Sequence, residues 1–257
     1  MILYSSPSSY YSMIARLALY ESGASFNIRR MDIHLAKEQL SPWYLELNPA
    51  MTVPTLTDAN ESWTDSRTIL LRAACIAGEQ WYDADRALST HIESIVDAHY
   101  AISIEHLTFV KAMIRFKMLR ILFPRLLKRI IHQLEVALPS STNPQATQNK
   151  ILLNQERLAY FTEGSLSQKL DSERASVENY LRRLPTSPTP LLFGCKPCSA
   201  DIVTTILCAR LNMIGEGDSV KAIPALANWY SQMQTRPAFN KADIWTRFQP
   251  WRILLRY

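Results

Sequence analysis

Hydroxyl and carboxylate side chains stand at two predicted helix starts in the first third of the chain. Ser9, Tyr11 and Ser12 lie in or next to a polar Ser/Pro loop that leads into a helical pattern, and Asp65-Ser66 directly precedes another. A helix N-terminus has free N–H groups and the positive end of the helix dipole, so either place can hold an anion. The alternative is that these residues only cap helices or face solvent.

The elements around these residues alternate between strand-like and helical patterns as far as Gly78. Pro49 and Pro54 interrupt the pattern between a helix and the strand after it, since proline lacks the N–H that both structures use. The predicted order is β-α-β, a further helix and then β-β-α, with strands at 2–4, 26–33, 55–57 and 62–64 and helices at 14–23, 36–47 and 65–77.

From residue 84 onward strand patterns disappear and long helical patterns continue to the C-terminus. Polar or proline-rich loops interrupt them at 139–149 and 185–190. The predicted architecture is a small α/β domain followed by a larger all-helical domain.

Composition points to an ordinary globular protein. The 257 residues are 47% hydrophobic and 20% charged, which excludes disorder and allows a sizeable core. Four cysteines are too few for a stapled secreted fold, and the N-terminus lacks the basic start and apolar run of a signal peptide. No apolar stretch is long enough to span a membrane. We therefore expect a cytoplasmic protein.

A basic segment carries the charge excess of the chain. Between Glu105 and Glu135 there are seven cations and no acid, against a formal net charge of +5 for the whole chain. Phe109, Phe116 and Phe123 recur there at helical spacing with Met113 and Leu119, which predicts one amphipathic helix whose apolar stripe packs inward. No nucleic-acid-binding motif accompanies the charge, so a solvated helix face is the simplest interpretation.

Histidine and cysteine patterns do not indicate a metal site. His91, His99 and His106 recur about every two turns of one predicted helix, without a partner set of carboxylates at metal-binding spacing. Cys195 and Cys198 form a C-x-x-C pair, but they lack a second ligand pair and precede a helical segment. We expect no metal in this protein.

Three motifs in order resemble the cytosolic glutathione transferase superfamily. They are Asn48-Pro49 with Val53-Pro54-Thr55-Leu56, Asp65-Ser66, and Ser199-Ala200-Asp201-Ile202. The chain is most similar to tetrachlorohydroquinone dehalogenases and bacterial β-aryl etherases. The resemblance implies a thioredoxin-like domain over 1–79, an all-helical domain over 84–257 with a long helical insertion at about 107–165, and a homodimer.

The resemblance also implies a glutathione site. Val53-Pro54 is where the family has a cis peptide bond, which would leave the Val53 backbone able to pair with the cysteinyl residue of glutathione. Ser66 would donate to the γ-glutamyl carboxylate, Asp65 would accept from its α-amino group, and Gln39 would bind the glycyl end.

Members of this superfamily activate the glutathione sulfur with a hydroxyl or thiol near the first helix. A donor aimed at the sulfur stabilises the thiolate and lowers the pKa of the thiol. Dehalogenase-like members have a reactive cysteine where this chain has Tyr11, so mixed-disulfide chemistry has no obvious participant. Ser9 and Ser12 both match family serines, and a tyrosine hydroxyl, such as that of Tyr11, could do the same work. We favour Ser12, because we expect it at the helix start, where the dipole adds to its hydrogen bond.

Two functions follow from these observations. The first is a glutathione-dependent transferase that conjugates a hydrophobic or aromatic electrophile, or cleaves an activated C–O or C–halogen bond by thiolysis. The second is a non-catalytic binding or scaffold protein that uses the basic amphipathic insertion for a partner or a membrane surface. We weigh the enzyme higher, and expect neither nucleic acid nor a membrane surface as a partner.

Overall fold

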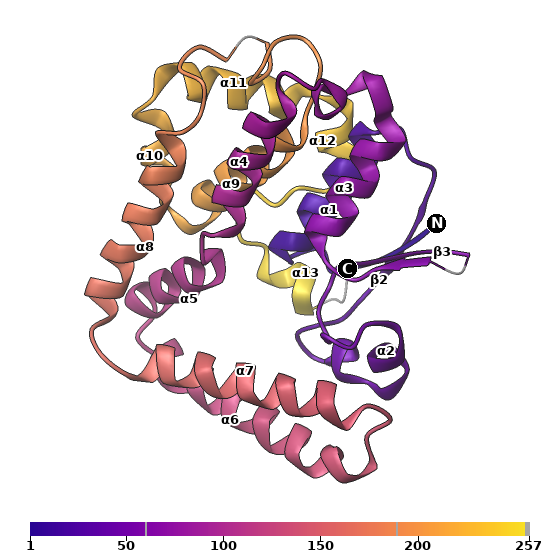
Figure 1. The fold of residues 1–257 in the computed structure, drawn as a ribbon. Coiled ribbons are helices and arrows are strands. Elements are labelled where there is room, and N and C mark those ends of the chain that lie inside the picture. Colours follow the sequence, from indigo (N-terminus) through magenta and orange to yellow (C-terminus); the bar gives the residue numbers. More distant parts are fainter. Residues whose placement is uncertain (60, 189, 255–257) are drawn as a thin grey trace. The chain divides into compact units, whose positions relative to one another are not determined.

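The structure is a computed structural model that describes residues 1–59, 61–188 and 190–254 (Figure 1). Its contacts divide the chain into two compact units. The first unit contains residues 1–36, 52–101 and the chain from 178 onward, and the second contains residues 37–51 and 102–177. The sequence predicts a domain boundary at 79–84, and each unit combines segments from both sides of it. The two predicted domains therefore describe the order of elements along the chain, and their boundary stays a prediction.

A four-stranded sheet lies in the first unit. Its strands are β1 (Ile2–Ser5), β2 (Asn27–Arg30), β3 (Thr55–Asp58) and β4 (Glu61–Trp63). The strand order is β2-β1-β3-β4, with β1 parallel to β2 and antiparallel to β3, and β3 antiparallel to β4. The four strands follow the predicted β-α-β and β-β-α order along the chain.

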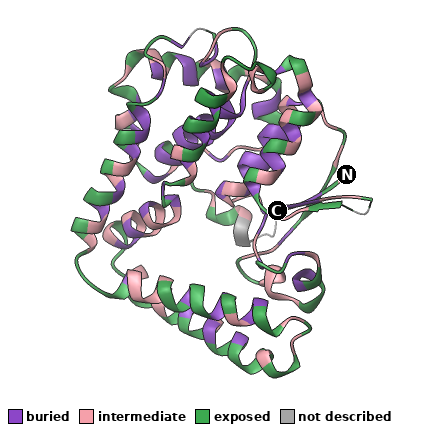
Figure 2. Ribbon diagram, viewed as in Figure 1, coloured by how far each residue is buried: buried purple, intermediate pink, exposed green. Residues whose placement is uncertain are grey.

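Helices α1 and α9 form the centre of the first unit. Both are buried along most of their length (Figure 2), and α1 contacts α3 and α9 while α9 also contacts α4. Ser9 and Asp65 cap α1 and α3 through their side chains, and left-handed Gly23 follows the end of α1. The helices of this unit are α1 (Tyr10–Glu21), α3 (Ser66–Ala77), α4 (Ser89–Tyr100), α9 (Ser199–Ile214), α10 (Asp218–Lys221), α11 (Pro224–Thr235), α12 (Pro237–Lys241) and α13 (Pro250–Leu254).

The second unit is entirely helical. The single helix predicted over 36–47 is wrong, because Lys37 has left-handed backbone angles and Pro42 begins a new helix as its N1 residue. A 3-10 turn at Glu38–Leu40 precedes the short α2. The helices of this unit are α2 (Pro42–Leu47), α5 (Ile104–Arg115), α6 (Leu119–Ala137), α7 (Pro144–Thr162) and most of α8 (Leu166–Leu181).

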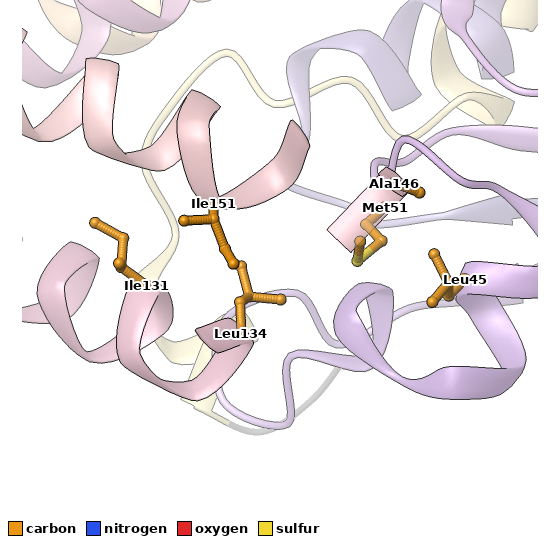
Figure 3. Close-up of a cluster of buried hydrophobic side chains, with 6 residues drawn as sticks. All are labelled: Leu45, Met51, Ile131, Leu134, Ala146 and Ile151. Carbon is orange, nitrogen blue, oxygen red and sulfur yellow. The ribbon is translucent and has the colours of Figure 1, made fainter. Parts of the chain in front are cut away.

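Helices α6 and α7 pack against α2 and the residues that follow it. Figure 3 shows the buried cluster that joins them, made of Leu45, Met51, Ile131, Leu134, Ala146 and Ile151. Beside it, the buried ammonium of Lys150 donates to the carbonyl oxygens of Ala50 and Met51, each at 3.0 Å. Burial lowers the pKa of Lys150 to about 8. The segment that leads to Val53 is therefore anchored at its first residues.

The basic segment is not the single inward-facing helix that its periodicity predicts. Helix α5 ends at Arg115, where Phe116 is extended, and α6 begins at Leu119. Met113 is buried, but Phe116 is 54% exposed. The Arg120 side chain donates to the carbonyl oxygen of Met113, one of the last carbonyls of α5 that no helical N–H can reach. The predicted fold class is nevertheless confirmed, since among the described residues the mixed sheet is followed by helices and no further strand.

Replacing Ile151 by alanine tests the α2–α6–α7 cluster. Ile151 is buried, so Ile151→Ala should lower the free energy of unfolding by about 2–4 kcal/mol through lost transfer energy and a cavity. The control is the neighbouring Leu152, which is exposed. Leu152→Ala should change the free energy of unfolding by less than about 0.5 kcal/mol. Urea unfolding followed by circular dichroism measures both. Equal effects of the two substitutions would contradict this packing.

Candidate active site at one end of the sheet

The strand register brings three chain segments to one end of the sheet. β1 is antiparallel to β3 with Tyr4 opposite Thr55, and β4 is antiparallel to β3 with Trp63 opposite Leu56. The end of β1, the start of β3 and the end of β4 therefore lie side by side at one end of the sheet. The loop into α1, the Val53–Pro54 bond and the start of α3 adjoin these strand ends, so the sequence-predicted site residues of the first unit gather there.

The hydroxyls at the start of α1 differ in accessibility. Ser9 is half-buried, and its oxygen accepts from the Ser12 backbone N–H at 3.3 Å as the helix cap. Ser12 is the third residue of the helix, has no exposed surface, and accepts from the Ser6 N–H at 3.3 Å. Tyr11 is half-buried. Ser12 thus lies in the first turn, as expected, but it is buried, whereas Ser9 and Tyr11 are the accessible hydroxyls of the three.

A buried arginine fixes the loop that leads into α1. The Arg16 side chain is 3% exposed and uses all five of its N–H donors. They bond the Ser5 hydroxyl (2.7 Å) and the carbonyl oxygens of Ser6 (3.0 Å), Pro7 (3.1 Å), Ala242 (2.6 Å) and Asp243 (3.2 Å). Burial lowers the pKa of Arg16 to about 10, and the nearby Asp243 carboxylate opposes that shift, so the group stays charged near neutral pH.

A second buried arginine lies beside the start of α1 without an anionic partner. Arg210 on α9 donates to the Ser8 carbonyl oxygen at 3.1 Å, and its guanidinium lies 5.3 Å from the centre of the Tyr10 ring. Within the described part of the chain it forms no ion pair, and its Nε has no hydrogen-bond acceptor. Burial lowers the pKa of Arg210 to about 10. A buried charge is ordinarily paired, so this one favours an anion nearby.

A neutral histidine contacts the first residue of α1. The Tyr10 hydroxyl and His99 Nε2 are 2.8 Å apart, and both side chains are buried. Burial lowers the pKa of His99 to about 3 and raises that of Tyr10 well above its usual value. The imidazole is therefore uncharged at neutral pH.

The start of α3 is joined to the start of α1 through an aromatic pair. The Asp65 carboxylate caps α3 by accepting from the N–H groups of Arg67 and Thr68 at 2.8 and 2.9 Å. The Ser66 hydroxyl is buried and hydrogen-bonds the Tyr100 hydroxyl at 2.9 Å. The Tyr100 ring stacks on Tyr11, with 6.3 Å between centroids and 9° between planes. The predicted anion site at α3 thus has an exposed carboxylate and a buried hydroxyl next to free helical N–H groups.

The remaining predicted binding residues lie in different units. The Val53–Pro54 peptide bond is cis, which confirms that expectation. Gln39 belongs to the second unit, where it lies in the 3-10 turn before α2. Its side-chain oxygen is buried and accepts no hydrogen bond from the residues that the structure describes.

Sequence reasoning missed Arg16, His99, Tyr100 and Arg210 as parts of this region. The three predicted histidines also do not share one helix, because His91 and His99 lie on α4 and His106 on α5. A usable signal was present for the two arginines: each is a cation within an otherwise buried helical run. What they bind could not be read from that signal.

Among residues 1–59, 61–188 and 190–254, no group of three histidine, cysteine or acidic side chains is arranged to hold a metal. The four cysteines, all of them described, are unpaired. The structure also describes no helix with both the length and the hydropathy needed to cross a bilayer.

Comparisons of sequence identify relatives of the chain. The model of the "Glutathione S-transferase, N-terminal domain" family matches residues 3–81. The tetrachloro-p-hydroquinone reductive dehalogenase of Sphingobium chlorophenolicum is 24% identical over 262 residues, which cover 94% of this chain and 95% of that protein. A stringent starvation protein A homolog of Coxiella burnetii is 39% identical over 70 residues, 27% of this chain and 32% of that protein.

Solved structures share the fold at low sequence identity. A glutathione transferase family member from Pseudomonas fluorescens, solved with two glutathione bound, has a TM-score of 0.66 at 15% identity, covering 95% of this chain and 92% of that one. Glutathione transferase E6 from Drosophila melanogaster has a TM-score of 0.64 at 17% identity, covering 94% and 90%.

The buried His99 predicts a specific loss of stability in acid. Its pKa is about 3 in the folded chain and about 6.5 in an unfolded chain, so between these values the unfolded state binds more protons. The free energy of unfolding should therefore fall as pH falls below 6.5, by up to about 1.4 kcal/mol per pH unit from this group. Urea unfolding at pH 7 and pH 5 measures this. His99→Gln keeps a polar side chain for Tyr10 and should reduce the pH dependence; an unchanged dependence in the variant would refute the role of His99.

Proposed function

The chain belongs to the glutathione transferase superfamily, and from this premise we propose that it binds glutathione at the described end of the sheet. The bound thiolate attacks a hydrophobic or aromatic electrophile. The reaction is a conjugation or the thiolytic cleavage of an activated C–O or C–halogen bond. The observation that carries the proposal is the meeting of three elements at one sheet end: the start of α1, the cis Val53–Pro54 bond and the start of α3.

The γ-glutamyl and cysteinyl parts of glutathione have complementary groups in this proposal. The γ-glutamyl carboxylate binds at the N-terminus of α3 and accepts from Ser66, while the exposed Asp65 carboxylate accepts from the α-amino group. The Val53 backbone pairs with the cysteinyl residue. The stack of Tyr11 on Tyr100 supports the arrangement, because it connects the Ser66 hydroxyl to the turn that would face the sulfur.

Stabilising the thiolate is the chemical task of the site. Lowering the pKa of a thiol from about 8.5 by two units requires only about 2.7 kcal/mol. A hydrogen bond from Ser9 or Tyr11, the N-terminus of α1 and the positive charge of Arg210 supply interactions of that size. We place Ser9 and Tyr11 before Ser12 as donors, because Ser12 has no exposed surface.

The hydroxyl that acts on the sulfur can be identified by substitution. Removing it should lower turnover of an activated aryl chloride roughly tenfold to hundredfold, since a hydrogen bond to a charged group contributes about 1.5–3 kcal/mol. Glutathione affinity measured by calorimetry should change little, because the bond forms to the ionised sulfur. The variants are Ser9→Ala, Tyr11→Phe and Ser12→Ala. Turnover that is unaffected in all three would remove a hydroxyl-stabilised thiolate from the mechanism.

Removing the buried charge of Arg210 should shift the pH profile of the reaction. In Arg210→Met the thiol of bound glutathione loses a nearby cation. At saturating glutathione, the acidic limb of kcat/KM for the electrophile should therefore move by about one unit to higher pH. Arg210→Lys retains the positive charge and should shift the acidic limb of the pH profile less. Circular dichroism of both variants controls for loss of folding. An identical profile in Arg210→Met and the unaltered chain would contradict this role.

A further inference from the structure

Helix α6 presents an apolar surface to solvent together with a row of cations. Met118, Ile121 and Leu122 are 67%, 55% and 44% exposed, and Leu126 continues the same face one turn later. Ile121 and Leu122 lie three and four residues after Met118, and Leu126 lies four residues after Leu122, so the four share one face of the helix. The opposite side, with Leu127, Ile131 and Leu134, is buried. Much of α6 is accordingly exposed in Figure 2.

Three cations lie along this stripe. Arg125 and Arg129 lie on the same side of the helix as Leu122, at intervals of three and four residues, and exposed Lys128 lies beside them. Within the described residues none of these three forms an ion pair, and the sequence contains no acid between Glu105 and Glu135. Their charge is therefore available to an external anion.

We propose that this stripe, defined as Met118, Ile121, Leu122, Arg125, Leu126, Lys128 and Arg129, binds an anionic lipid surface reversibly. The proposal reverses the expectation from the sequence, which had the apolar side of this segment packed inward, because these apolar side chains are exposed. Met118, Ile121, Leu122 and Leu126 enter the boundary between headgroups and acyl chains, and the cations contact lipid phosphates. Long basic side chains suit this position, because their aliphatic stems can lie in the apolar layer while the charges reach the headgroups. The helix lies in the plane of the interface, in agreement with the lack of a membrane-spanning helix among the described residues.

Two other occupants fit the surface less well. A second copy of this chain on the same stripe would bring two sets of unpaired cations together, and like charges repel. A nucleic acid would contact the cations but would leave the aliphatic side chains without an apolar partner, since its outer surface is polyanionic. A lipid surface with anionic headgroups above an apolar layer can contact both the cations and the apolar side chains of the stripe.

Co-sedimentation with vesicles tests the proposal on the full chain. The protein should pellet with vesicles of phosphatidylcholine and phosphatidylglycerol, and much less with phosphatidylcholine alone. Raising the salt concentration should release it, since exposed charges are screened. Equal pelleting with the two kinds of vesicle, or none with either, would overturn the proposal.

Paired substitutions separate this surface from general charge. Arg125→Gln with Arg129→Gln should weaken vesicle binding roughly tenfold to thirtyfold, and Ile121→Ser with Leu122→Ser should also weaken it severalfold. The matched control, Arg182→Gln with Arg183→Gln, removes the same charge from two exposed positions just after α8. This variant should bind nearly as the unaltered chain does.

A soluble polyanion distinguishes a membrane from an acidic protein partner. If polyglutamate binds the chain as tightly as the anionic vesicles do, and the Ile121/Leu122 pair leaves vesicle binding unchanged, the surface recognises charge alone and the lipid proposal fails. Turnover of the aryl chloride in solution should be the same in the Arg125/Arg129 pair as in the unaltered chain, so the outcome is independent of the proposed enzyme activity.

Discussion

The buried guanidinium of Arg16 is the interaction on which the rest of the first unit depends. It joins the loop after β1 to Ala242 and Asp243, near the other end of the chain, and leaves none of its five donors unsatisfied. Because most of its acceptors are backbone carbonyl oxygens, these hydrogen bonds fix the backbone path of the loop after β1. That path sets where α1 begins, and so where Ser9 and Tyr11 lie relative to the cis Val53–Pro54 bond. Removing a buried charge of this kind would leave several polar groups unpaired at once.

The proposed site combines a positive charge with polar groups that stay neutral. Arg210 is buried without an ion pair among the described residues, while burial keeps His99 uncharged and Tyr10 protonated. Electrostatic interactions are stronger in such surroundings than in water, because little solvent screens them. An incoming thiolate would supply the missing negative charge. The proposed lipid surface belongs to the second unit and uses different chemistry, with exposed cations and exposed apolar side chains. The two proposals therefore stand on separate residues and can fail separately.

Local signals in the sequence account for the parts of the structure that could be predicted. Ser9 and Asp65 are strong helix caps, Gly23 and Gly78 end helices, and the prolines mark the breaks, so the order of strands and helices followed. The contacts that shape the site could not be predicted in this way, because their partners are far apart in the chain: Arg16 and Ala242 are separated by 226 positions, Arg210 and Ser8 by 202, and Tyr10 and His99 by 89. The basic segment shows the same limit. Its periodicity is helical throughout, yet the helix breaks after Arg115, and which side of α6 is buried depends on α2 and α7.

Activation of glutathione is the central claim, and a pH titration of its thiolate absorbance tests it most directly. The ultraviolet absorbance of the thiolate would be followed from acid to alkaline pH with and without the purified chain. We expect bound glutathione to ionise with a pKa one to two units below the value of about 8.5 for an ordinary thiol. If calorimetry detects binding but the thiol titrates as it does in free solution, the site holds glutathione without activating it, and the account is contradicted.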